Sequence, residues 1–289
     1  MKILVLGCNG QLGRCLNDQL HNSTHEVVYT SREQIDIVDF KKTKNQILRI
    51  SPDLIINATA YTAVDTAEDE HQIADLVNHL AIANMASICN MLGCWLFHMS
   101  TDYVFDGSSR VPYTELDGTN PQGVYGETKL NGELSILSSG CKHIILRTAW
   151  VFSEYGNNFL KTMLLLGKNQ DELRVVNDQI GCPTSGHDIA RVLISILPYL
   201  ERESAVSGIY HFCGGNHCSW YDFSLEIFKI AKIMGYSTPK KVHPVDSIEF
   251  PTKAIRPPYS VLDISKLHLK FNIRPVSLDE SIALVISKL

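Results

Sequence analysis

Short apolar runs and longer segments with helical periodicity alternate along the first half of the chain. The apolar runs predict buried strands at 3–6, 27–29, 53–58, 95–99 and 143–152. The segments between them predict helices, one ending near residue 20, one from about 68 to 91, and one at 124–137. Strands that alternate with helices indicate an α/β protein with a doubly wound parallel sheet and helices on both of its faces.

The pattern changes near residue 153. Prolines and glycines become frequent, and two helical segments remain clear, at 187–200 and 221–234. We therefore expect a first domain at 1–152 and a smaller mixed lobe at 153–289. The lobe is expected to interleave with the first domain, so that one boundary is an approximation.

Composition narrows the choice of partners and of compartment. The 289 residues carry a net charge of -5, which argues against sequence-independent binding to nucleic acid or to an anionic membrane. No apolar run reaches the length of a membrane span, and the apolar start of the chain is too short for a secretory signal. These features favour the cytoplasm.

The eight cysteines are scattered and form no CxxC pair, which fits reduced thiols in that compartment. His211, Cys213, His217 and Cys218 lie close together in the sequence, but their spacing matches no common zinc finger. A strand followed by a turn is the simpler interpretation of this segment, and we expect no metal there.

Three glycines follow the first strand and open the first helix. Gly7 allows the tight turn, Gly10 lets the backbone approach a pyrophosphate, and Gly13 lets the helix pack on the strand. The spacing is GxxGxxG rather than the more usual GxGxxG, but its strand–turn–helix context predicts a Rossmann-like dinucleotide-binding domain at 1–152. The lobe at 153–289 would then bind the substrate. Two further residues of this loop are expected to contact the cofactor, Gln11 and Leu12.

The end of the second strand bears on the choice of cofactor. This stretch contains no carboxylate to bind an adenosine 2′-hydroxyl, and Ser31 and Arg32 are instead placed to bind a 2′-phosphate. We therefore favour NADPH over NADH, although a solvated loop arginine would give the same sequence. Asp36 and Ile37, a little further on, are expected to flank the adenine.

A tyrosine and a lysine stand four positions apart on the helix predicted at 124–137. Tyr125 and Lys129 therefore share one helix face. A free phenol has a pKa of about 10, and a nearby ammonium group together with an oxidised nicotinamide lowers it toward neutrality. The lysine also has the reach to hold the nicotinamide ribose. A surface tyrosine beside a lysine gives the same spacing, so the pair needs support from its surroundings.

That support comes from the residues after the strand predicted at 95–99. The carboxyl ends of parallel strands face the cofactor crevice, where the Thr101 hydroxyl is placed to donate to a substrate carbonyl. Ser100 remains an alternative, because side chains alternate along a strand and only one of the two faces the site.

The glycine loop, the strand-end hydroxyl and the YxxxK pair, in this order, resemble the extended short-chain dehydrogenases/reductases. Within that superfamily the chain resembles the dTDP-4-dehydrorhamnose reductases over nearly its whole length. The segments that carry the resemblance are 57–65, 100–105, 124–130, 147–151, 156–159, 178–184 and 256–260.

The resemblance implies an NAD(P)H-dependent reduction of the 4-keto group of dTDP-4-dehydro-L-rhamnose, a step in making deoxy-sugar nucleotides for cell-surface polysaccharide. Tyr125 would give the proton, Lys129 would lower the pKa of Tyr125 and bind the ribose, and Thr101 would polarise the carbonyl. The nicotinamide half of the cofactor would lie against Ala58, Ala60, Tyr61 and Thr62. The sugar nucleotide would contact Thr101, Asp102, Tyr103, Trp150 and Asn157, although Trp150 is open to a second interpretation as a buried aromatic at a strand end.

The chain departs from the family in one respect. Some members hold magnesium at a dimer interface with carboxylates, one of them on the first helix. Here that helix begins with Arg14 and Cys15, and a second such position holds His187. We therefore expect no metal, and the same departure weakens the inference of a homodimer.

Three rival functions remain. Sugar-nucleotide 4,6-dehydratases share the glycine loop and the YxxxK pair but need an Asp-Glu pair after the strand-end threonine, where this chain has Asp102 and Tyr103. Reduction of another 4-keto-6-deoxy sugar nucleotide stays open. A non-catalytic NADP-binding subunit that regulates methionine adenosyltransferase is the third rival.

Overall fold

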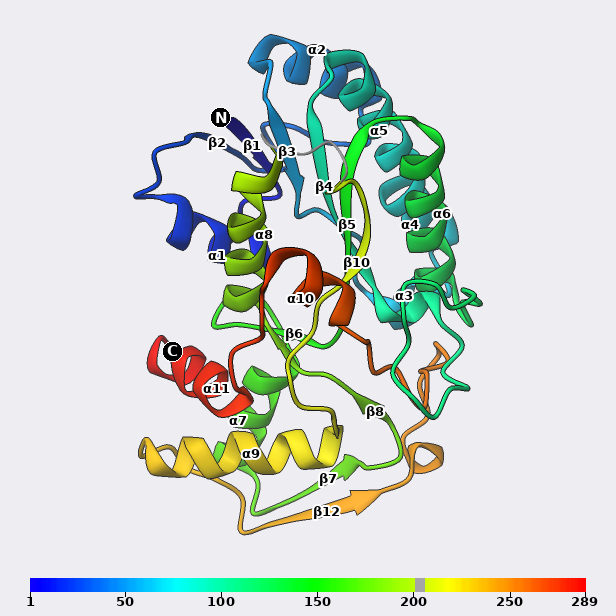
Figure 1. The fold of residues 1–289 in the computed structure, drawn as a ribbon. Coiled ribbons are helices and arrows are strands. Elements are labelled where there is room, and N and C mark those ends of the chain that lie inside the picture. The colour runs from blue at the N-terminus through cyan, green and yellow to red at the C-terminus, as the bar shows by residue number, and fades with distance from the viewer. Residues whose placement is uncertain (201–205) are drawn as a thin grey trace.

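The computed structural model describes residues 1–200 and 206–289, and its centre is a six-stranded parallel sheet (Figure 1). The strands lie in the order β10-β5-β4-β3-β1-β2. The α/β class and the parallel sheet predicted from the sequence are confirmed. The bounds of the strands are β1 (Lys2–Leu6), β2 (Glu26–Thr30), β3 (Leu54–Asn57), β4 (Trp95–Thr101), β5 (Lys142–Thr148) and β10 (Gly208–His211).

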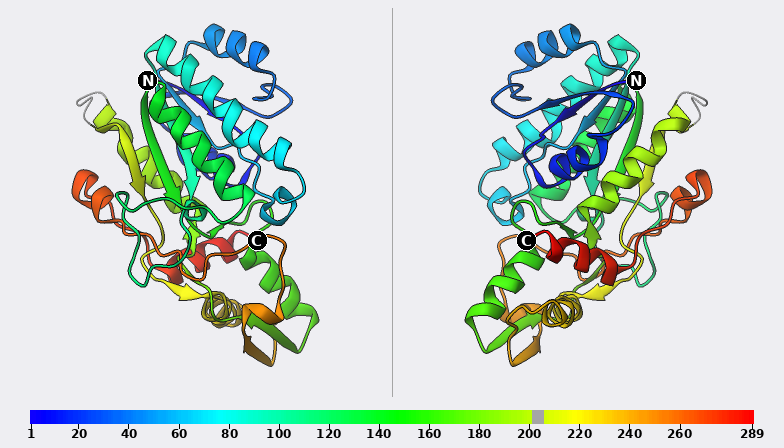
Figure 2. Two further views of the ribbon diagram at one scale, coloured as in Figure 1. Left: turned by 90° about the vertical axis from the view of Figure 1, so that its right-hand side faces the viewer. Right: turned by 90° about the vertical axis from the view of Figure 1, so that its left-hand side faces the viewer.

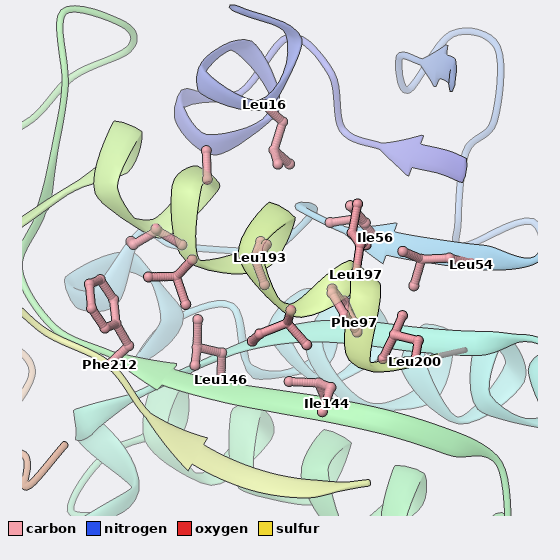
Figure 3. Close-up of a cluster of buried hydrophobic side chains, with 14 of the residues drawn as sticks. Leu16, Leu54, Ile56, Phe97, Ile144, Leu146, Leu193, Leu197, Leu200 and Phe212 are labelled. Carbon is pink, nitrogen blue, oxygen red and sulfur yellow. The ribbon is translucent and has the colours of Figure 1, made fainter. Parts of the chain in front are cut away.

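Helices cover both faces of this sheet. α1 (Gln11–Leu20) and α8 (Gly186–Leu200) pack on one face, where Leu16 and Leu193 meet strand residues such as Ile56 and Phe97 (Figure 3). The opposite face is covered by α2 (Phe40–Ile50), α5 (Ala81–Leu92) and α6 (Val124–Ser138). The strands are apolar on both faces because both are buried.

The helix predicted from about 68 to 91 is broken. It consists of α4 (His71–Asp75), the π turn η1 (Leu76–Leu80) and α5, preceded by the short α3 (Val64–Ala67). The π turn turns Asn78 inward, where its side chain accepts from the backbone N–H of Tyr61 and donates to the Tyr61 carbonyl. A local π turn of this kind commonly places a polar side chain at a functional site.

The lobe is built around α7 (Phe159–Asn169), α9 (Trp220–Ile233) and α11 (Leu278–Ser287), which share one hydrophobic core (Figure 2). A parallel pair, β7 (Glu172–Val176) and β12 (Lys241–Val245), flanks α9. α9 begins with a capping box in which Ser219 and Asp222 bond each other's backbone N–H groups.

Shorter elements complete the lobe and its junction with the sheet. Two small ladders join β8 (Ile180–Gly181) to β11 (Cys218–Ser219) and β6 (Val151–Phe152) to β9 (Thr184–Ser185). The short α10 (Ser265–Phe271) packs on β10. α8 and β10 both follow residue 152, yet α8 packs on the central sheet and β10 is one of its strands. The dinucleotide-binding part and the lobe therefore interleave along the chain. The boundary at 152 stays a prediction.

Within the described residues no helix is both long and apolar enough to cross a membrane. All eight cysteines are free thiols.

Candidate active site

A cleft of about 430 Å³ opens beside the carboxyl ends of β1 and β3. The chain runs from β1 to β2 on one side and then to β3 on the other, so this is the point where the strand order reverses. Ligands of open α/β sheets bind at such a point. The predicted cofactor residues that line the cleft are Gly7, Gly10, Ser31, Arg32, Asp36, Ile37, Ala58, Ala60 and Tyr61.

The glycine loop leaves no room for side chains. Gly7 has a φ of +82°, and a Cβ on Gly13 would lie 2.2 Å from the Gly7 carbonyl oxygen. α1 begins next to this loop without a side-chain cap or an acidic residue in its first turn, so no side chain compensates the partial positive charge of its N-terminus. A tight, cation-like cradle of this kind fits a dinucleotide pyrophosphate.

Six other predicted cofactor residues do not line this cleft: Gln11, Leu12, Gly13, Thr62, Tyr125 and Lys129. The Gln11 side chain accepts hydrogen bonds from Ser153 and Asn158, at 2.9 and 3.0 Å, and so joins α1 to the lobe. Leu12 packs against the hydrophobic core, Gly13 lies under the loop, and Thr62 is exposed beyond the cleft.

Sequence reasoning missed several lining residues. The missed residues are Asn9, Glu33, Ile35, Val38, Thr59, Ile73 and Val77. Ile73 is recognised only once the structure is known. It carries an apolar side chain that is half exposed on a helix facing the cleft, which marks a surface that a ligand can cover.

At the 2′-phosphate end of the cleft, Arg32 is almost fully exposed and its Nε atom lies 3.5 Å from Asp36 Oδ2. The arginine is therefore free to turn toward an anion. Its role in binding a 2′-phosphate stays a prediction.

The strand-end threonine and the helix tyrosine lie together. The Thr101 hydroxyl at the end of β4 lies beside the Tyr125 hydroxyl on the first turn of α6, close enough to act on its pKa. It also donates to Asp102 Oδ1 at 3.0 Å. The two hydroxyl groups that the sequence assigned to one carbonyl therefore point to one place.

The pKa of Tyr125 differs from the expectation. Burial raises it above the ordinary value of a phenol, and the neighbouring Thr101 hydroxyl opposes that shift without reversing it. The Lys129 ammonium donates instead to the Met99 carbonyl oxygen at 2.6 Å. The expected lowering of the Tyr125 pKa by Lys129 is therefore not found, and burial keeps the proton on Tyr125 throughout the neutral range, as a proton donor needs.

Lys129 is buried, and its surroundings are polar. Burial lowers its pKa to about 8, against an opposing effect of the Glu133 carboxylate. Its Nζ lies 3.3 Å from His98 Nε2, and His98 Nδ1 lies 3.1 Å from the amide nitrogen of Asn57. The lysine therefore stands at the end of a buried row of polar side chains that reaches from α6 into the sheet.

Ser100, the alternative to Thr101, points away from the tyrosine. Its hydroxyl donates to Glu133, which is also held by two hydrogen bonds from Arg147, at 2.6 and 2.9 Å. Glu133 and Arg147 are both buried, so their charges depend on each other. The geometry favours Thr101 as the hydroxyl of the site and assigns Ser100 to this ion pair.

Asp102 and Tyr103 complete the wall next to the hydroxyl pair. Burial raises the pKa of Asp102 to about 6, and its Oδ2 atom has no hydrogen-bond partner among the described residues. The Tyr103 ring meets the Tyr125 ring edge to face at 5.5 Å. Its hydroxyl accepts from Arg256 at 3.3 Å, and Arg256 also binds Asp65 at 2.8 Å.

Arg256 also lines a second cavity of about 470 Å³, which lies in the lobe. The walls of this cavity are largely apolar and include Phe159, Met163, Leu166, Val175 and Trp220. Sequence reasoning did not predict this cavity. Its walls come from α7, β7, α9 and the segment at 250–256, which lie far apart in the sequence and meet only in the folded protein.

Trp150 and Asn157 do not line that cavity. The Trp150 indole is stacked on Trp220 with 3.4 Å between ring centroids, and a Cβ on Gly181 would lie 2.4 Å from it. Trp150 has a φ of +48°, so its backbone is held in a conformation that bulky side chains seldom adopt. Asn157 is exposed, while its neighbour Asn158 caps α7 and bonds Gln11. Their contacts with a substrate stay predictions.

The residues first considered for zinc have other contacts. His211 Nδ1 lies 3.0 Å from the Tyr113 carbonyl oxygen, and the Cys213 thiol donates to the Leu262 carbonyl oxygen. The strand predicted before the turn is β10.

Comparison with known proteins adds a family. The model of the RmlD substrate binding domain matches residues 1–289. A dTDP-4-dehydrorhamnose reductase of Sinorhizobium fredii is 40% identical over 284 residues, covering 97% of this chain and 95% of the relative. One from Aggregatibacter actinomycetemcomitans is 43% identical and covers 95% and 94% of the two chains.

Two solved structures agree with these sequence matches. A dTDP-4-dehydrorhamnose reductase from Clostridium acetobutylicum has a TM-score of 0.92 at 40% identity and covers 100% of this chain and 99% of its own. The enzyme from Bacillus anthracis, solved in complex with NADP, has a TM-score of 0.92 at 33% identity with the same coverage.

Proposed function

The chain belongs to the RmlD substrate binding domain family, and from this membership and its site we propose that it is an NADPH-dependent dTDP-4-dehydrorhamnose reductase. The observation that carries the proposal is the placement of the Thr101 and Tyr125 hydroxyls side by side, with Lys129 one helical turn from Tyr125. Two hydroxyl donors at one point are what a ketone oxygen needs as it becomes an alkoxide.

The cleft beside β1 and β3 fits the cofactor. Gly7, Gly10 and Gly13 leave the space for a pyrophosphate, and the open first turn of α1 favours its charge. When bound there, the reduced nicotinamide supplies the hydride for the carbonyl carbon. We favour NADPH because Arg32 lines the cleft and because the Bacillus anthracis relative is solved with NADP.

The chain's own residues handle the proton. Tyr125 is protonated before turnover, because burial raises the pKa of its phenol, and it donates that proton to the sugar oxygen as the oxygen gains charge. Thr101 lies beside the phenol, and its hydroxyl, which donates to Asp102 in this structure, would turn to donate to the same oxygen when the sugar is bound. Lys129, one helical turn along α6, would then stabilise the tyrosinate that is left.

We assign the nucleotide half of the substrate to the lobe cavity. Its apolar wall suits a base, and Arg256 lies between this cavity and Tyr103, where a guanidinium group is able to meet a diphosphate. The Trp150–Trp220 stack adjoins the cavity through Trp220.

The rival functions require other groups. Dehydration needs a carboxylate after Asp102, but Tyr103 is there, and its hydroxyl is bound to Arg256. A purely regulatory subunit does not need a buried Thr–Tyr hydroxyl pair with a buried lysine below it. Reduction of a related 4-keto-6-deoxy sugar nucleotide uses the same groups, so only the choice of sugar distinguishes that rival.

The test is a matched pair of variants. Wild-type protein should oxidise NADPH in the presence of dTDP-4-dehydro-L-rhamnose, and Tyr125→Phe should lose about 10²- to 10⁴-fold in kcat while still binding NADPH. Tyr236→Phe, which removes an exposed phenol in the lobe, is the control and should keep wild-type turnover. NADPH binding without oxidation by the wild type would favour the regulatory rival, and faster turnover of another 4-keto sugar would reassign the substrate.

A further inference from the structure

A lysine ammonium lies inside a cluster of groups that suit a metal ion. Within residues 1–200 and 206–289, Asp18, Glu154 and His187 form a group whose ligand atoms all lie within 4.8 Å of one another. Lys288 Nζ lies 3.2 Å from Glu154 Oε1, 3.1 Å from His187 Nε2 and 3.6 Å from Asp18 Oδ2. The lysine therefore occupies the space between these donors.

The first helix does carry a carboxylate toward this place. This carboxylate is Asp18, which lies one turn beyond Arg14 along α1. Asp18 accepts from the Tyr155 hydroxyl at 2.8 Å, so its orientation is fixed from a second side.

The cluster needs a cation. Glu154 is almost fully buried, and both of its oxygens lie 2.9 Å from His187 Nε2. A buried carboxylate is costly unless an opposite charge lies beside it. The field of the cluster also reaches Cys15, whose thiol pKa is raised to about 12 by burial and then by the charges of Glu154 and Asp18.

We infer that Lys288 is the permanent cation of this cluster and replaces the magnesium ion that some family members hold. A divalent ion does not fit the group as it stands, because it would have to displace the ammonium from three contacts. The two roles differ in what they depend on: a metal ion depends on its concentration in solution, whereas the lysine is part of the chain.

The position of Lys288 gives the replacement a structural role. Lys288 directly follows α11, which packs on α9 in the core of the lobe, while Asp18 lies on α1 beside the sheet (Figure 1). His187 lies at the start of α8, which packs on α1. The ammonium therefore fastens the end of the lobe to the dinucleotide-binding part of the molecule without a bound ion.

Manganese binding tests the inference, since Mn²⁺ accepts carboxylate and imidazole ligands and is counted directly by electron paramagnetic resonance. It also avoids the free cysteines, which would bind Zn²⁺. Wild-type protein should not bind Mn²⁺ at this cluster, so the Asp18→Asn substitution should leave its Mn²⁺ binding unchanged. Lys288→Met should gain one such site, at least about 10-fold tighter than any in the wild type because the ammonium no longer repels the ion. In Lys288→Met, a further Asp18→Asn substitution should abolish it.

Thermal unfolding gives the second readout. Lys288→Met should lower the Tm more than Lys240→Met does, because Lys240 pairs with Asp171 on the open surface. Mn²⁺ should then raise the Tm of Lys288→Met and leave that of Lys240→Met unchanged. Lys288→Gln, which keeps a polar side chain, is the second variant if the methionine variant does not fold.

Two results would overturn the inference. One is a wild-type Mn²⁺ site that disappears with Asp18→Asn. The other is a folded Lys288→Met or Lys288→Gln protein that binds no additional Mn²⁺. Neither result bears on the reductase reaction, which is measured separately through Tyr125→Phe.

Discussion

The Nε2 atom of His98 lies 3.3 Å from the Nζ atom of Lys129 in the interior of the protein. The tautomer of His98 follows from its neighbours. The Thr59 backbone N–H donates to Asn57 Oδ1, which turns the Asn57 amide nitrogen toward His98 Nδ1. Nδ1 therefore accepts, and in the neutral ring the hydrogen sits on Nε2, facing Lys129. Burial lowers the pKa of His98 well below 6.5, so the ring is neutral.

This arrangement predicts a pH effect. The His98 Nε2–H dipole points its positive end at Lys129 and so favours the uncharged amine. Removing the His98 ring should therefore raise the pKa of Lys129 from about 8. Activity that depends on the ammonium falls as pH rises through that pKa. In His98→Leu this alkaline limb of the kcat profile should therefore move to higher pH, by about 0.5 to 1 unit.

The matched variant is His98→Gln, whose amide is able to restore a donor near Lys129 and should bring the limb back toward the wild type. A purely structural role for His98 would lower stability in both variants without moving the limb. An alkaline limb that stays in place or moves to lower pH in His98→Leu contradicts the assignment of the tautomer.

Thr101 and Ser100 give a second contrast. Thr101→Val keeps the shape of the side chain and removes the hydroxyl shared with Tyr125, so kcat should fall about 10²- to 10³-fold with little change in NADPH affinity. Ser100→Ala removes a donor to buried Glu133 and should instead lower the free energy of unfolding by about 1–3 kcal/mol. Steady-state kinetics and urea unfolding of both variants check the contrast, and it fails if Ser100→Ala is the variant that loses turnover.

The difference between these two hydroxyls shows where sequence reasoning ends. Thr101, Tyr125 and Lys129 were found because their chemistry is tied to a fixed spacing on a strand and a helix. Glu133, His98 and Asn57 were missed because they come from three different elements and act through contacts across α6, β4 and β3. Alternation along β4 required that only one hydroxyl face the site, but the partner Glu133 was needed to say which.

The same limit applies to the substrate lobe. The helix patterns at 187–200 and 221–234 correspond to α8 and α9, because their apolar faces repeat regularly and bury large areas. β10 is only four residues long, and its membership of the main sheet depends on pairing with β5 across a wide gap in sequence. The cavity near Arg256 likewise has no local signal.

Asp102 provides a third prediction, on stability. Burial raises its folded pKa to about 6, above the ordinary value of 3.8, so the folded protein is destabilised by the charged form at higher pH. Asp102→Asn removes that charge and should raise the free energy of unfolding by about 1–2 kcal/mol at pH 7.5, since the unpartnered new amide offsets part of the gain.

The pH dependence of that gain has a definite sign. It should be complete above pH 6 and should disappear as pH falls toward 3.8, where Asp102 is protonated in both states. Urea unfolding at pH 7.5 and at pH 4 measures it. An Asp102→Asn protein that is less stable than the wild type at pH 7.5 would show that the carboxylate has a partner that compensates its charge.

Arg32 decides the last prediction, on the choice of cofactor. Its side chain is almost fully exposed and its ion pair with Asp36 is long, so the contact contributes little to stability and is easily exchanged for a phosphate. A charge-assisted hydrogen bond to a 2′-phosphate is stronger, so Arg32→Ala should raise the Kd for NADPH about 10- to 100-fold. NADH, which has a hydroxyl at that position, should bind to Arg32→Ala within about 2-fold of its affinity for the wild type.

Arg49→Ala, which removes an exposed arginine on α2, is the control and should change neither affinity. Titration of both cofactors by fluorescence compares the three proteins, and equal losses for NADPH and NADH in Arg32→Ala would mean that Arg32 contacts the part the two cofactors share.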